Sequence, residues 1–121
     1  VVKTALAPFL CMVSDQEAWV PDAPIHSHGD QGIRGTMEDL WVVVEHLRSF
    51  CGFPVPEGQT DDIFIGLYDG HTGKEAAEFA RDHLHYYLAN QPTYETDMEA
   101  SLAKTFFQTD EGFIRSAPGS E

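Results

Sequence analysis

Two runs of apolar residues predict two β-strands. Residues 40–44 read Leu-Trp-Val-Val-Val, and residues 63–68 read Ile-Phe-Ile-Gly-Leu-Tyr. β-Branched and aromatic side chains favour the extended conformation. The second run is apolar at nearly every position, which is typical of a strand buried on both faces. We therefore expect two neighbouring strands, the second in the middle of the fold.

After the second strand, apolar residues recur at helical spacing and predict two helices. The first is expected from about Gly73 to Asn90 and the second from about Asp97 to Ile114. Each start has a capping-box pattern, formed by Thr72 with Glu75 and by Thr96 with Glu99. The expected buried positions are Ala76, Ala80, Leu84, Tyr87 and Leu88 in the first helix, and Met98, Leu102, Phe106 and Phe113 in the second.

The remaining segments predict a further short strand and several loops. Residues 1–24 contain three prolines and are expected to be extended or loop structure, while residues 25–35 suit a short strand and a tight turn. Residues 49–62 and 117–121 are expected to be loops. Two helices in succession do not form alternating βαβ units, so we expect an α+β fold with an antiparallel sheet and helices on one face. One sheet and one helical layer would be half of a larger architecture.

Composition narrows the classes of protein. The chain has 121 residues, one domain at most, and 42% of them are hydrophobic, enough for a packed core. The net charge of −13 argues against binding to nucleic acid or to anionic membranes, since both rest on basic surfaces. No apolar run approaches the roughly 20 residues that span a bilayer. Cys11 and Cys51 are too few for a disulfide scaffold, which favours a reducing, intracellular and cytoplasmic location.

The sequence Asp69-Gly70-His71 follows the second strand directly. A carboxylate at a strand end can project into a site, and a glycine lets the backbone approach a ligand, with its carbonyl as a further oxygen donor. His71 could donate a proton to a leaving group. The alternatives are that Asp69 only caps the following turn and that His71 is simply exposed.

A second motif, Arg34 to Asp39, combines a cation with adjacent carboxylates. On an extended segment Glu38 and Asp39 point to opposite faces, so one could face an ion while the other orients a water. Arg34 could hold a phosphate, or pair with Glu38 or Asp39. A pair of solvated carboxylates is the alternative. His26 and His28 alternate on the expected strand, and ordinary surface positions explain them better than metal binding.

Together, Arg-x-x-Met-Glu-Asp at residues 34–39 and Asp-Gly-His at residues 69–71 resemble the metal-dependent Ser/Thr protein phosphatases of the PP2C (PPM) family. Residues 106–113 look like that family's Phe-x-x-x-Asp-x-x-Phe helix. The resemblance covers about Gly29 to Ile114. It implies an α/β sandwich, with antiparallel sheets between helical layers, of which this chain represents about the N-terminal half: residues 1–24 as an extension and residues 25–121 as the N-terminal part of the phosphatase domain.

The resemblance also implies a mechanism. Two Mg²⁺ or Mn²⁺ ions would be held by Asp69, Glu38 and the Gly70 carbonyl, with Asp39 holding a metal-bound water. Arg34 would bind the substrate phosphate, and His71 would be the general acid. The family's later aspartates are absent, so the isolated chain is expected to be inactive and to need the missing C-terminal half of the domain as a partner. The alternative function is a non-catalytic, phosphatase-like binding scaffold.

Overall fold

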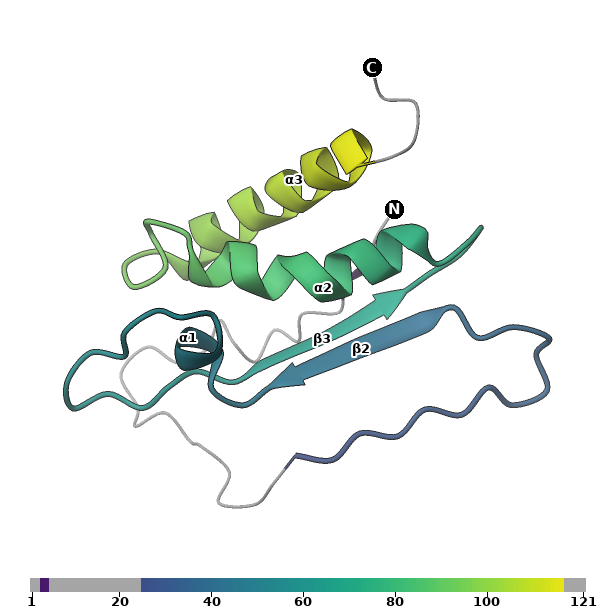
Figure 1. Cartoon of the computed structure of the whole chain (residues 1–121), viewed down its shortest axis with the longest axis horizontal. Helices are drawn as coiled ribbons and strands as arrows, with labels where there is room; N and C mark the ends of the chain where they lie inside the picture. Colours follow the sequence, from purple (N-terminus) through teal and green to yellow (C-terminus); the bar gives the residue numbers. More distant parts are fainter. Residues whose placement is uncertain (1–2, 5–24, 117–121) are drawn as a thin grey trace.

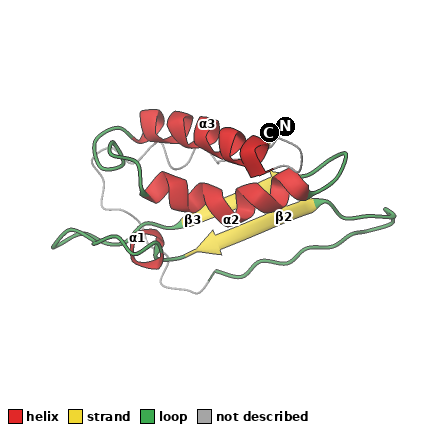
Figure 2. Ribbon diagram, turned by 45° about the horizontal axis from the view of Figure 1, so that its top comes forward, coloured by secondary structure: helices red, strands yellow, loops and turns green. Residues whose placement is uncertain are grey.

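The computed structural model describes residues 3–4 and 25–116, and within them it has an α+β fold. Figures 1 and 2 show a small antiparallel sheet with two long helices, α2 and α3, on one side of it. This arrangement confirms the expected fold class, with one sheet and one helical layer. The elements in chain order are β1 (Lys3–Thr4), β2 (Asp39–Val44), α1 (Leu47–Phe50), β3 (Phe64–Asp69), α2 (Glu75–Ala89) and α3 (Met98–Ser116).

The strands lie in the order β1-β3-β2, and β3 pairs antiparallel with both neighbours. Phe64 and Tyr68 of β3 are almost fully buried, whereas Ile65 and Leu67 are 50% and 46% exposed. The strand therefore alternates, and the expectation that both of its faces are buried is wrong for the described residues. The apolar side chains on the second face have no covering layer there, so the second face is called the open face below.

Helix α2 covers the other face of the sheet. Ala77, Ala80 and Leu84 are buried with Phe64 and Tyr68 in one hydrophobic core. Alanines at this spacing bring the helix backbone close to the strands. The predicted stripe is thus shifted by one position at its start, because Ala76 is only half-buried while Ala77 is buried.

Both helices begin later than their predicted caps. The N-cap of α2 is Lys74, without a side-chain hydrogen bond, and Thr72 has a left-handed φ of 64°. Glu75 is therefore the first residue of the helix and not the third, so the capping box with Thr72 is not formed. In α3 the cap is shifted by one residue, since the Ala100 amide donates to Asp97 Oδ1 at 2.9 Å.

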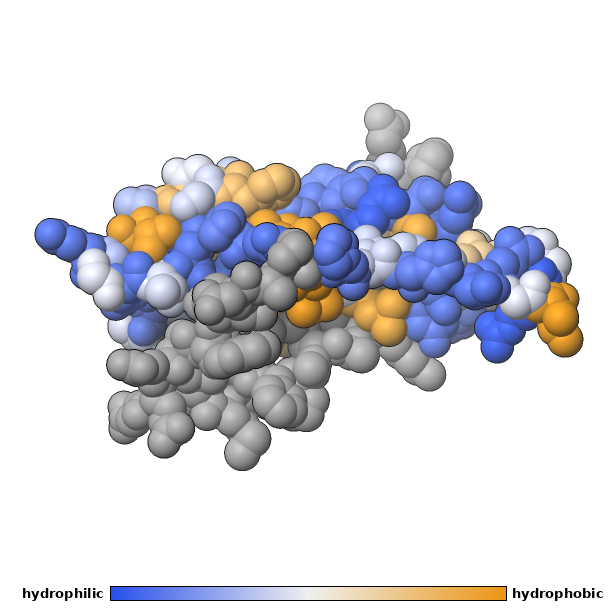
Figure 3. Space-filling view, turned by 90° about the horizontal axis from the view of Figure 1, so that it is seen from below, coloured by the Kyte–Doolittle hydropathy of each residue, from blue (hydrophilic) through white to orange (hydrophobic). Residues whose placement is uncertain are grey.

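Helix α3 packs along α2 through small side chains. Ser101, Thr105 and Thr109 are its buried residues. The predicted apolar stripe lies beside them and is half-buried at the rim of the core: Met98, Leu102, Phe106 and Phe113. Small residues at the interface let two helices approach closely, and hydrophobic periodicity alone does not reveal such an interface. Figure 3 shows the molecule from below the view of Figure 1. The described part of this surface carries several separate hydrophobic patches.

No strand forms within residues 25–35, so that prediction is wrong. The segment runs beside β2 (Figure 1), attached by Ile25 N–H to Glu45 Oε1 at 3.2 Å and by Trp41 Nε1–H to Ser27 Oγ at 2.8 Å. Side-chain bonds replace the backbone ladder that a strand would need. The predicted turn is present around Gly32, whose φ is 62°.

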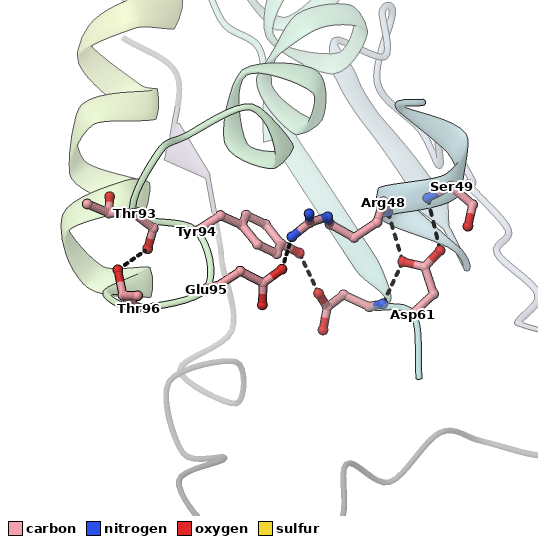
Figure 4. A network of polar contacts seen from close by, with 8 residues as sticks. Arg48, Ser49, Asp61, Thr93, Tyr94, Glu95 and Thr96 are labelled. Atoms are coloured by element: carbon pink, nitrogen blue, oxygen red, sulfur yellow. Dashed lines mark hydrogen bonds and ion pairs between the residues drawn. The ribbon is translucent and has the colours of Figure 1, made fainter. Parts of the chain in front are cut away.

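At the end of the sheet where β2 ends, a polar network joins α1 to the α2–α3 loop (Figure 4). Arg48 forms an ion pair with Glu95, and its guanidinium lies 4.8 Å from the centre of the Tyr94 ring. Tyr94 Oη–H donates to Asp62 Oδ2 at 2.6 Å. Asp61 accepts the amide hydrogens of Arg48 at 2.8 Å and Ser49 at 3.0 Å. The one-turn helix α1 was not predicted from the sequence. It is stabilised by the Asp61 carboxylate, which comes from the loop between α1 and β3.

Two smaller expectations concern thiols and membranes. Cys51 is a free, half-buried thiol, whereas Cys11 lies outside the described residues. In the described part of the chain, no helix combines the length and apolar character needed to cross a bilayer. The extended or loop structure predicted for residues 1–24 lies outside the described residues except at Lys3–Thr4, which form β1, and the loop predicted for residues 117–121 lies outside them entirely.

Candidate functional site

The β2–β3 pairing brings the two sequence motifs together. Asp39 is the first residue of β2, Asp69 is the last residue of β3, and the two lie directly opposite each other. Directly opposite residues of an antiparallel pair share a face, and their Cβ atoms are roughly 5 Å apart. Both are exposed on the open face, in line with Trp41–Leu67 and Val43–Ile65. The site therefore begins as two carboxylates side by side at one end of the sheet.

Gly70 connects the second motif to Glu38 of the first. A Cβ atom built on Gly70 would lie 2.5 Å from the Glu38 carbonyl oxygen and 3.3 Å from Glu38 Cβ. Any larger residue at position 70 would push the two strand ends apart. Here glycine is required for close approach of two backbones rather than for a positive φ.

The turn after Gly70 holds His71 beside these carboxylates. Thr72 has φ 64° and Gly73 has φ 110°, so the chain reverses within a few residues before α2 begins. A threonine in the left-handed region is uncommon because its β-branched side chain meets the backbone. Such strained residues are often retained beside functional sites. The turn keeps His71 exposed at the rim.

A single pocket of about 430 Å³ collects all six predicted site residues. Its lining residues are Asp30, Gln31, Arg34, Thr36, Met37, Glu38, Asp39, Asp69, Gly70 and His71. The pocket is formed by the loop before β2 and by the β3–α2 turn, which meet at the right-hand end of the sheet in Figure 1. The structure thus brings together residues that are more than thirty positions apart in the sequence.

The charged groups of the pocket do not pair with one another. Among the described residues, no ion pair joins Arg34 to Glu38 or Asp39, the alternative raised by their spacing. Two like charges directly opposite in a sheet destabilise each other unless a cation lies nearby. The alternative in which Arg34 pairs with a neighbouring carboxylate is therefore not seen among the described residues.

The donor chemistry fits a hard divalent cation, since the candidate donors are carboxylate and carbonyl oxygens. Their number is small, because the described chain has no group of three His, Cys, Asp or Glu side chains placed to hold an ion. These residues fit part of a coordination shell. Completing it would require donors from outside the described chain.

Three pocket residues were not singled out from the sequence, namely Asp30, Gln31 and Thr36, and Met37 was named only as part of the motif at residues 34–39. Asp30 accepts the Gly32 amide hydrogen at 2.6 Å, and Gln31 Nε2–H donates to the Arg34 carbonyl at 2.6 Å. An aspartate two residues before a glycine is a recognisable turn signal. No sequence pattern indicated the hydrogen bond from Gln31 to the Arg34 carbonyl.

Comparison with known proteins gives a consistent family assignment. The model of the family described as protein phosphatase 2C matches residues 25–119. The chain is 30% identical over 102 residues to "Probable protein phosphatase 2C 22" of Arabidopsis thaliana, covering 84% of this chain and 26% of the relative. It is 31% identical over 104 residues to "Protein phosphatase 1F" of Homo sapiens, covering 86% of this chain and 21% of the relative.

A third relative, "Probable protein phosphatase 2C 76" of Arabidopsis thaliana, is 36% identical over 86 residues, covering 71% of this chain and 18% of the relative. The chain thus spans about a quarter or less of the length of these three curated relatives. No solved structure matches it significantly.

Proposed function

Because the chain belongs to the protein phosphatase 2C family, we propose that it supplies one part of the active site of a metal-dependent Ser/Thr phosphoprotein phosphatase. The substrate would be a phosphoprotein, and the reaction would be hydrolysis of its phosphate monoester by an activated water. The remaining part of the site would come from the rest of the domain.

The observation that carries this proposal is the opposition of Asp39 and Asp69 across the β2–β3 pair. Within residues 25–116, neither carboxylate forms an ion pair with a cationic side chain. Like charges directly opposite each other destabilise a strand pair, and a bound divalent cation would offset that repulsion. A structural role would be served better by hydrogen bonds such as those made by Asp61.

Within the pocket, each residue has a role in the proposal. Asp69 would contribute to both of two Mg²⁺ or Mn²⁺ ions, while Glu38 and the Gly70 carbonyl would add oxygen ligands. Bound divalent cations supply a water of lowered pKa and offset negative charge on the phosphoryl group. Asp39 would accept a hydrogen bond from the attacking water and so fix its direction.

Arg34 and His71 would act on the substrate itself. The guanidinium of Arg34 presents a planar set of N–H donors that matches phosphate oxygens and is not committed to an ion pair in the described part of the chain. His71, exposed at the pocket rim, would donate a proton to the departing serine or threonine oxygen.

The open face suggests where the rest of the domain would dock. Ile65 and Leu67 are about half exposed, and Trp41 and Val43 lie opposite them on the same face. We propose that a second sheet covers this face and brings the remaining metal ligands to the end where Asp39 and Asp69 lie. Without that second sheet, the exposed apolar side chains of the open face favour association of the isolated chain.

The test is a phosphatase assay on the full-length protein that carries this chain, with a phosphopeptide and Mn²⁺. We expect turnover that EDTA abolishes and added Mn²⁺ restores. The isolated 121 residues, titrated with Mn²⁺ by calorimetry, should bind weakly and show no turnover. Absence of turnover by the full-length protein would overturn the proposal and favour a binding scaffold instead.

A further inference from the structure

The loop that holds Arg34 is organised by two side-chain hydrogen bonds. Asp30 Oδ1 accepts the Gly32 amide hydrogen at 2.6 Å, which fixes the turn with φ 62° at Gly32. Gln31 Nε2–H then donates to the Arg34 carbonyl at 2.6 Å and spans that turn. The loop is thus closed on itself immediately before Arg34 enters the pocket.

Packing supports the two flanks of this loop but not its centre. A Cβ atom on Gly29 would collide with the Trp41 indole and would lie 2.8 Å from Met37 Cε, so Gly29 lies close to both side chains. In contrast, Ile33 and Arg34 are exposed, and Arg34 forms no ion pair within the described chain. The hydrogen bond from Gln31 is therefore the contact that holds the Arg34 backbone.

We propose that Gln31 is a positioning residue that orients Arg34 for binding the substrate phosphate. This inference rests on the proposed phosphatase function and deepens it. A guanidinium binds phosphate through two parallel N–H donors, which demands a defined orientation. An exposed loop without an internal anchor would have to lose conformational freedom each time phosphate binds, and affinity would fall.

Gln31 is itself exposed, so its removal leaves no cavity in the core. Its substitution should therefore act on the loop and not on the stability of the fold. Gln31→Met tests this directly, since methionine keeps the length of the side chain and removes the N–H donor without adding charge. Gln59→Met is the matched control, because Gln59 is an exposed glutamine in a turn outside the pocket.

The experiment measures phosphopeptide hydrolysis by the full-length Mn²⁺-loaded enzyme, and calorimetric binding of inorganic phosphate to the same protein. For Gln31→Met we expect KM and the phosphate Kd to rise by about threefold to tenfold, the equivalent of one hydrogen bond, with kcat changed by less than about twofold. The thermal midpoint and all values for Gln59→Met should match wild type.

A double-mutant cycle separates positioning from general loosening. If Gln31 acts through Arg34, adding Gln31→Met to Arg34→Ala should change KM no further. A full additional loss in the Arg34→Ala background, or unchanged KM and phosphate Kd for Gln31→Met in an active enzyme, would overturn the positioning role. Wild-type protein without any turnover would instead overturn the proposed function, and this inference with it.

Discussion

At each end of the sheet an arginine accompanies two adjacent acidic residues. At the network end, Asp61 accepts three amide hydrogens, from Arg48 at 2.8 Å, Ser49 at 3.0 Å and Asp62 at 2.8 Å. Asp62 accepts the Tyr94 hydroxyl hydrogen, and Arg48 pairs with Glu95. At the pocket end, the side chains of Glu38, Asp39 and Arg34 form no ion pair among the described residues.

The comparison teaches that the same residue types serve stability at one end and remain available for ligands at the other. Burial alone would raise the pKa of Asp61, but hydrogen bonds from Ser49, Arg48 and Asp62 outweigh it and lower that pKa. Carboxylate oxygens that already accept hydrogen bonds in this way are not available to bind a ligand. The pocket carboxylates retain their bonding capacity, and that difference can be tested by changing matched residues at both ends.

The largest expected effect is on activity. Asp69→Asn in the full-length protein should lower kcat/KM by at least about 10²-fold, because the proposed oxygen ligand of both metal ions would lose its charge. Asp62→Asn, the matched change at the network end, should leave kcat/KM within about twofold. Similar activity losses for the two variants would contradict the comparison.

Gly70→Ala should disturb the pocket end sterically. The new methyl group would lie against the Glu38 carbonyl, so the strand ends must separate, at a cost of about 1–3 kcal/mol in the free energy of unfolding. Urea denaturation measures that loss. Gly52→Ala is the control for glycine removal at the network end: nothing lies within 4 Å of a Cβ there, and only its φ of 81° opposes the change. Activity should suffer only in Gly70→Ala.

Tyr94→Phe should weaken the network end alone. The hydroxyl is buried against Asp62, and burial followed by this hydrogen bond raises the Tyr94 pKa. Its loss should cost about 1 kcal/mol, since Asp62 is exposed and water replaces the donor. The measurement is urea denaturation together with kcat/KM, which should not change. A change in KM would mean that the two ends are coupled.

The smallest effect concerns pH. Burial lowers the pKa of His85 in the folded protein, and this effect is partly opposed by the backbone of Arg81 and by the negative charge of Asp82. The unfolded state therefore binds a proton first, near the ordinary histidine pKa of about 6.5, and the free energy of unfolding should fall as pH drops from about 7 through that value toward the folded pKa. His85→Gln should flatten this region of a stability–pH curve, whereas an unchanged slope would mean that another group titrates there.

Sequence reasoning succeeded where a local pattern determines structure. The β-branched run at residues 40–44 and the apolar run at residues 63–68 became β2 and β3, and both long helices formed. It failed where tertiary partners decide. Whether β3 is covered on one face or two depends on another layer, and the buried stripe of α3 depends on the surface of α2.

The site shows the same limit. The motifs named six residues that line one pocket, but only the register of β2 with β3 placed Asp39 opposite Asp69. Register is a long-range property that neither motif encodes by itself. Likewise, Thr72 looks like a helix cap in the sequence, and only the tight reversal after His71 explains its left-handed φ.

Trp41 is an intrinsic fluorescent probe of the open face. Its indole is half-buried, lies opposite Leu67 and is two residues along β2 from Asp39. The chain has two tryptophans, so a Trp19→Phe variant leaves a single fluorophore on that face. Emission from this side chain shifts to shorter wavelength when water is displaced, so assembly of the complete domain can be followed in real time without any label.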